Sequence, residues 1–205
     1  MKVILINGSP NAKGCTYTAL SEVAATLNAE GVETEIIHIG NKDIRGCIGC
    51  RKCKETGKCV FNDIVNEVAP KFAECDGIVL GSPVYYAGPN GTVLSFADRL
   101  FYSTPFSKRM KVGAAVVSAR RGGNTATFDV LNKYFSISEM PIATSGYWNM
   151  VHGYNAEDVY ADKEGVWTMQ TLGRNMAFLI KAIKLAKEQI GLPENEPHIF
   201  TSFHR

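Results

Sequence analysis

Residues 3–18 read VILINGSPNAKGCTYT, and the interpretation of the whole chain starts from this segment. Its first four residues form a short apolar run that ends in a glycine-containing turn, which is typical of a strand buried on both faces, as in parallel sheets. From 16 to 30, apolar residues recur every three or four positions, which predicts an amphipathic helix. Segment 32–39 alternates apolar and polar residues and predicts a second strand at or near a sheet edge. The N-terminal part therefore predicts one βαβ unit.

The rest of the chain continues the alternation of strands and helices. Further strands are predicted at 78–80, 112–117 and 140–144. Further helices are predicted at 63–73 with Asn62 as N-cap, 93–101, 125–134 and 171–190, while 148–165 is aperiodic. We therefore expect an α/β, flavodoxin-like, doubly wound, five-stranded parallel sheet of order 2-1-3-4-5 with helices on both faces. Such a sheet binds its ligand beside the carboxyl ends of strands 1 and 3.

The chain shows no internal repeat, low-complexity segment or linker, so we expect residues 1–205 to form a single domain. Two segments stand apart from the regular pattern. A cysteine-rich loop occupies 46–60, and a polar and aromatic segment at 147–166 is long enough to act as a subunit interface or a lid.

Charge and hydropathy exclude several classes of protein. The chain has 22 Lys and Arg against 20 Asp and Glu, a net charge of +2, which disfavours a protein that binds nucleic acid or a membrane surface. No segment approaches the roughly 20 apolar residues of a membrane span. The N-terminal apolar run is too short for a signal peptide. We therefore expect a cytoplasmic protein whose six cysteines stay reduced.

The loop at 8–18 has the composition of a phosphate site. A helix N-terminus offers free N–H groups and a positive dipole end to an anion. Ser9, Thr16 and Thr18 add hydroxyl donors, and Gly8 and Gly14 allow close backbone approach. The spacing fits neither the dinucleotide fingerprint nor the P-loop. The alternative is a simple βα turn with a threonine N-cap.

Two later loops would meet this one at the same sheet edge. Segments 82–91 and 118–124 follow the third and fourth predicted strands and are rich in glycine. The first also carries Tyr85 and Tyr86, for which ordinary packing is the alternative role. A flat isoalloxazine ring needs an apolar face and backbone partners along its polar edge. The three loops together therefore predict a site for FMN.

The cysteines of segment 46–60 follow a metal-binding pattern. Cys47, Cys50, Cys53 and Cys59 have the spacing C-x2-C-x2-C-x5-C, and a compact C-x2-C-x2-C run is a local signature of a 4Fe–4S cluster. Structural zinc more often uses two separated C-x2-C pairs. Zinc and a loop without metal are the alternatives. Because this loop follows the second strand, we expect it to open on the same sheet edge as the flavin.

The motifs G-S-P-x-x-x-G-x-T at 8–16, S-P-V-Y-Y at 82–86 and R-x-G-G at 120–123 resemble those of the NADPH-dependent FMN reductase superfamily. Within it, the chain is most similar to the iron–sulfur flavoprotein branch. The resemblance implies that FMN contacts Ser9, Asn11, Gly14, Thr16, Tyr17, Thr18, Pro83, Val84, Tyr85, Tyr86, Asn90, Ser118, Arg120, Gly122 and Gly123. It also implies a homodimer or homotetramer.

We consider three functions. The first is an FMN-dependent oxidoreductase that passes electrons from NAD(P)H to a quinone, free flavin or oxygen, with no catalytic side chain because the flavin carries the chemistry. The second is an electron carrier that takes electrons from ferredoxin through the cluster. The third is a flavin-binding regulatory module.

Overall fold

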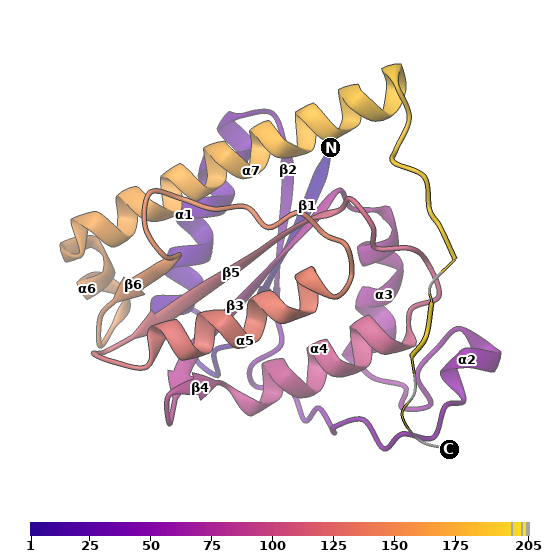
Figure 1. Ribbon diagram of the computed structural model, residues 1–205. Coiled ribbons are helices and arrows are strands. Elements are labelled where there is room, and N and C mark those ends of the chain that lie inside the picture. Colours follow the sequence, from indigo (N-terminus) through magenta and orange to yellow (C-terminus); the bar gives the residue numbers. More distant parts are fainter. Residues whose placement is uncertain (198, 202, 204–205) are drawn as a thin grey trace.

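The computed structural model describes residues 1–197, 199–201 and 203. It contains a parallel sheet with helices on both faces (Figure 1). The strands are β1 (Lys2–Asn7), β2 (Glu33–His38), β3 (Gly77–Tyr85), β4 (Gly88–Pro89), β5 (Val112–Ala119) and β6 (Met150–His152). Five of them follow the order β2-β1-β3-β5-β6, and β4 pairs antiparallel with the end of β3. The predicted fold class is confirmed, with β2 at the edge.

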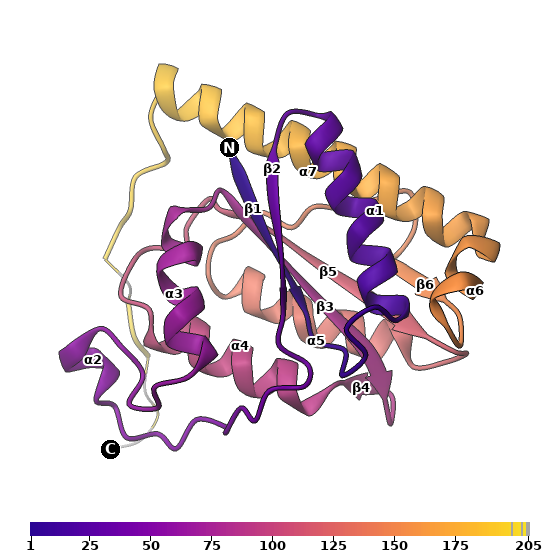
Figure 2. The same ribbon diagram turned by 180° about the vertical axis from the view of Figure 1, so that it is seen from behind.

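Helices cover the sheet in two layers (Figures 1 and 2). They are α1 (Cys15–Ala29), α2 (Cys53–Thr56), α3 (Ile64–Glu74), α4 (Gly91–Ser103), α5 (Asn124–Ser136), α6 (Ala156–Ala161) and α7 (Lys163–Gln189). Apolar residues of α1, α6 and α7 form one core with one face of the sheet, and those of α3, α4 and α5 form a second core with the other face. Among the described helices, none combines the length and the apolar content that a bilayer span requires.

The central position of β1 explains its unbroken apolar run. Val3 and Leu5 belong to the core with α1 and α7, whereas Ile4 and Ile6 belong to the core with α3, α4 and α5. All four side chains are fully buried. Complete burial of such a side chain stabilises the fold by about 1.5–3 kcal/mol, so both faces of β1 must be apolar.

The fifth strand lies later in the chain than the sequence predicts. Segment 140–144 makes a single bridge to β5, at Ile142, and the strand proper is β6, which pairs with Val117–Ala119 of β5. Pro141 has no N–H, and its carbonyl accepts from Gly113 N at 2.9 Å. The prediction of a strand at 140–144 is therefore wrong, although this segment does run beside β5.

Three predicted boundaries also change. The N-cap of α3 is Asp63, whose side chain accepts from Val65 N, and not Asn62. β3 continues to Tyr85 because Pro83 still pairs with β5 and the strand then turns into β4. The segment predicted as aperiodic contains β6, α6 and the start of α7, with Asn155 and Asp162 as the helix N-caps.

The packing of β5 against α5 gives a test of the fold. A Cβ added at Gly113 would lie 2.4 Å from two atoms of the Phe135 ring. We expect Gly113→Ala to lower the free energy of unfolding by about 1–3 kcal/mol, the range for overpacked cores. Gly91→Ala is the control, because no described atom lies within 4 Å of its added Cβ. Urea titrations compare the two variants with wild type, and equal stability of all three proteins would contradict the packing.

Candidate functional site

The loop after β1 lies tightly against β3 at the carboxyl edge of the sheet. Gly8 N donates to Gly81 O at 2.9 Å. A Cβ at Gly8 would lie 2.8 Å from Gly81 O and from Val93 Cβ. A side chain at Gly8 is therefore incompatible with this approach, and the loop is fixed at the edge where β3 ends.

Asn7 fixes the shape of the same loop from inside. Its buried side chain accepts from Ser9 N at 3.1 Å and donates to Ala12 O at 3.2 Å. Ser9 Oγ in turn accepts from Asn11 N at 3.2 Å. Asn7 is not among the predicted site residues, and the signal that could have identified it is a polar residue directly after the buried apolar run of β1.

The N-terminus of α1 has no cap of its own. Gly14 occupies the N-cap position, the first turn contains no acidic residue, and no described side chain caps it. Helices α2 and α5 also lack a side-chain cap, whereas α3, α4, α6 and α7 are capped by Asp63, Asn90, Asn155 and Asp162. The first N–H groups of α1 are thus available to an anion, which the positive end of the helix dipole also favours.

Two hydroxyl groups meet beside this helix end. Thr16 Oγ1 and Ser118 Oγ are 2.8 Å apart and buried, which joins the start of α1 to the end of β5. Thr18 Oγ1 instead donates to Gly14 O, within the helix, at 3.3 Å. The hydroxyl groups of Thr16 and Ser118 are therefore adjacent, while that of Thr18 serves the helix backbone.

A cavity of about 620 Å³ opens at this point, within the usual range for small-molecule sites. Nine of the residues that the sequence assigned to FMN line it: Ser9, Asn11, Gly14, Thr16, Pro83, Val84, Tyr85, Ser118 and Arg120. Lys13 and Arg120 are the basic residues of its lining, and Glu157 is the acidic one. The loops after β1, β3 and β5 thus form one cavity with anion-binding groups at one side.

The other six predicted residues, Tyr17, Thr18, Tyr86, Asn90, Gly122 and Gly123, lie outside this lining. Tyr86 is fully exposed at the tip of the β3–β4 hairpin, with φ +48°. Asn90 is buried and accepts from Thr92 N at 2.7 Å as the cap of α4. Gly123 precedes α5 with φ +92°, and its added Cβ would lie 2.8 Å from Ala87 Cα. Asn90 and Gly123 therefore shape the loops beside the cavity.

The sequence analysis did not assign segment 153–157 to this cavity. These residues line it together with Cys15, whose Sγ donates to Asn155 O at 3.0 Å. Burial raises the pKa of the Cys15 thiol, so it stays protonated near neutral pH. The capping box of Asn155 and Asp158 is the signal that could have located this turn.

The four predicted metal ligands line a second, smaller pocket. Cys47, Cys50, Cys53 and Cys59 surround it together with Phe61, Arg99 and Tyr102. Its volume is about 20 Å³, and the described residues contain no group of three His, Cys, Asp or Glu side chains positioned for a single metal ion. Cys47 and Cys50 are on an exposed segment beside Gly49, and no described atom lies within 4 Å of a Cβ added at Gly49. Four cysteine thiolates are the donor set of an iron–sulfur cubane, and these four cysteines line one pocket.

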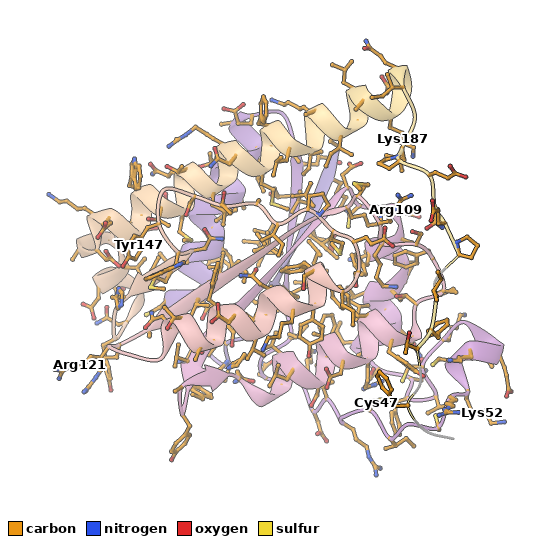
Figure 3. The ribbon with its side chains drawn as sticks, viewed as in Figure 1. Cys47, Lys52, Arg109, Arg121, Tyr147 and Lys187 are labelled. Atoms are coloured by element: carbon orange, nitrogen blue, oxygen red, sulfur yellow. The ribbon has the colours of Figure 1, made fainter. Side chains whose placement is uncertain are left out.

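The two sites lie at opposite ends of α4. The β3–β4 hairpin, whose residues Val84 and Tyr85 line the larger cavity, leads into the start of this helix, whereas Tyr102 and Ser103 at its end line the cysteine pocket. Figure 3 shows Cys47 and Arg121 on opposite sides of the molecule. His38 Nε2, at the end of β2, lies 2.8 Å from Ser9 O, so the chain leaves β2 beside the loop that follows β1. The cysteines that come later line a separate pocket.

The doubly wound sheet, the uncapped α1 and the cavity at the carboxyl edge define a flavodoxin-like protein. Residues 1–155 match the model of the NADPH-dependent FMN reductase family, and the chain belongs to that family. It is 38% identical over 195 residues to an iron–sulfur flavoprotein of Methanocaldococcus jannaschii. The matched region covers 90% of this chain and 100% of that protein.

Solved structures show the same fold. RosB, solved with 8-demethyl-8-formylriboflavin-5'-phosphate, has a TM-score of 0.71 at 10% identity, over 100% of this chain and 92% of RosB. A flavodoxin from the domain Archaea has a TM-score of 0.61 at 15% identity, over 88% of this chain and 99% of that flavodoxin. The predicted fold and family are confirmed, and the family and its relatives support the predicted cofactors.

Proposed function

We propose that this protein is an FMN-dependent oxidoreductase. It takes electrons from NAD(P)H or ferredoxin and passes them, through FMN and a 4Fe–4S cluster, to a small acceptor such as a quinone, free flavin or oxygen. The observation that carries the proposal is the uncapped N-terminus of α1, which faces a cavity of about 620 Å³. Membership of the NADPH-dependent FMN reductase family supports it.

In this proposal the chain contacts both the phosphate group and the isoalloxazine ring of FMN. The N–H groups of the first turn of α1, with the side chains of Ser9, Asn11 and Thr16, bind the phosphate. Segments 83–86 and 118–123 contact the ring. Asn90 fixes the loop between residues 83–86 and α4. Bound FMN supplies hydride and single-electron chemistry, and the residues of the cavity orient it.

Cys47, Cys50, Cys53 and Cys59 hold the cluster in this proposal, as the name of the M. jannaschii relative suggests by analogy. The cluster supplies one-electron steps. Lys52, Lys54 and Lys58 lie in the same segment and offset the negative charge of four thiolates. The donor set also fits because all four cysteines line one pocket that is mostly apolar.

The proposal treats residues 1–205 as one domain in a homodimer or homotetramer. Segment 147–166 is the proposed interface, because it carries the exposed rings of Tyr147, Trp148, Tyr154 and Tyr160. All six cysteines are unpaired, which fits the reducing cytoplasm that we propose as its location.

The phosphate assignment predicts a difference between FMN and riboflavin. Thr16→Val removes a hydroxyl donor at the helix end, and a hydrogen bond to a charged group contributes about 1.5–3 kcal/mol. We therefore expect FMN affinity to fall about ten- to a hundredfold while riboflavin affinity stays near that of wild type. Thr171→Val on α7, whose hydroxyl accepts from Arg174, is the control. Fluorescence titration of both flavins measures this, and equal losses for the two would contradict phosphate binding.

The ligand assignment predicts selective loss of iron. Cys50 is exposed, so Cys50→Ala should fold normally, lose the iron and keep FMN. Cys75→Ala is the control, because burial raises the pKa of the Cys75 thiol to about 11 and keeps it protonated, unlike a metal ligand. Iron and flavin are measured in protein purified without oxygen. Iron that persists at wild-type level in Cys50→Ala would overturn the ligand set.

A single-electron carrier is the second candidate, favoured by the four-cysteine pocket because hydride transfer alone requires no cluster. The electron donor that the protein accepts distinguishes the two functions. We expect the holoprotein to oxidise NADH or NADPH in the presence of a quinone at a rate above that of free FMN. Oxidation of reduced ferredoxin without any oxidation of nicotinamide would favour the carrier. Bound FMN without turnover of either donor would favour a regulatory module.

A further inference from the structure

Arg99 is the largest fully buried side chain among the described residues, and it lies beside a cysteine of the metal pocket. It is on the third turn of α4. Its Nε donates to Cys59 Sγ at 3.2 Å. Its two terminal nitrogens donate to both carboxylate oxygens of Asp63, at 2.6 and 2.9 Å, and to the carbonyls of Arg45 and Phe61. All five N–H groups of the guanidinium thus have an acceptor.

These contacts give Arg99 one orientation. Asp63 receives a two-point ion pair and also caps α3 through Val65 N. The guanidinium carbon lies over the ring of Phe61, 5.0 Å from the ring centroid. Since the terminal nitrogens are fixed by the carboxylate and the carbonyls, the Nε–H can point only along the remaining direction, toward the sulfur of Cys59.

Cys59 is itself held in place by hydrogen bonds from its backbone to α3. Asn66 of α3 accepts from Cys59 N at 3.0 Å and donates to Cys59 O at 2.9 Å. Cys47 and Cys50, in contrast, are on the exposed segment. The pocket therefore has one side that is fixed before any cluster binds, and Arg99 is the charged group on that side.

We propose that Arg99 is a positioning residue that sets the reduction potential of the cluster through its hydrogen bond to Cys59. The inference rests on the proposed function, because it needs a cluster at the four cysteines. Hydrogen bonds to cluster sulfurs stabilise the reduced, more negative state and raise the potential. Because the buried Arg99 forms a charge-neutral pair with the partly exposed Asp63, the hydrogen bond acts on the sulfur without adding net charge to the pocket.

This neutrality allows the hydrogen bond to Cys59 to be removed without a change in net charge. In Arg99→Met/Asp63→Asn both charges disappear, the net charge is unchanged, and asparagine is still able to cap α3. Arg99→Lys keeps the positive charge for Asp63, but an ammonium lacks the planar fork that serves the carboxylate and the sulfur together. Asp63→Asn alone keeps the donor to Cys59 and leaves the arginine charge unbalanced.

The experiment is an anaerobic redox titration of the holoprotein with dithionite, in which the cluster takes up one electron and is followed by electron paramagnetic resonance. We expect the reduction equilibrium constant to fall about tenfold in the double variant and in Arg99→Lys, a shift of about 59 mV for a one-electron couple. Asp63→Asn alone should shift the potential in the opposite direction. Arg174→Met, an exposed arginine of α7, should leave it unchanged.

Iron content and the thermal midpoint of each metal-free variant accompany the titration. If the double variant fails to keep iron, the shift in the reduction potential of Arg99→Lys tests the role of Arg99 instead. Unchanged potentials in iron-loaded variants would overturn the role of Arg99 and leave the proposed cofactors standing. A wild-type protein that takes up no iron would overturn both claims, and its own iron analysis identifies that case.

Discussion

The N–H groups in the first turn of α1 set the main constraint on this molecule. Buried or half-buried N–H groups must find acceptors, and within the described residues no side chain supplies one at this helix end. The close approach of Gly8 to Gly81 and the bracing by Asn7 hold the turn at the edge where the parallel strands end. The loops after β3, β5 and β6 meet there because the sheet aligns their carboxyl ends.

Helix α4 extends this constraint to the second site. Its N-terminus is capped by Asn90, directly after the β3–β4 hairpin, and Arg99 and Tyr102 from its last turns line the cysteine pocket. A buried ion pair such as Arg99 with Asp63 contributes little net stability, because the loss of hydration offsets the attraction. The hydrogen bond that Arg99 donates to the sulfur of Cys59 explains this ion pair better than a contribution to the stability of the fold.

Local features of the chain predicted β1, the phosphate loop and the cysteine pattern, because an apolar run, a glycine turn and a fixed spacing are visible in adjacent residues. The fifth strand was misplaced because pairing with β5 depends on distant residues, and both Ile142 and Met150 find a place beside it. The role of 153–157 was missed for the same reason. Arg99 gave no sequence signal, since a charged residue within a helix is usually exposed and its partners lie 36 and 40 positions away.

The most direct test of the account is the flavin and iron content of protein purified without oxygen, read from its visible spectrum and by chemical analysis. The account predicts a coloured protein with about one FMN and about four irons per chain. A colourless protein that does not take up FMN at micromolar concentration would contradict the assignment of the α1 turn to the FMN phosphate, and with it the proposed redox function.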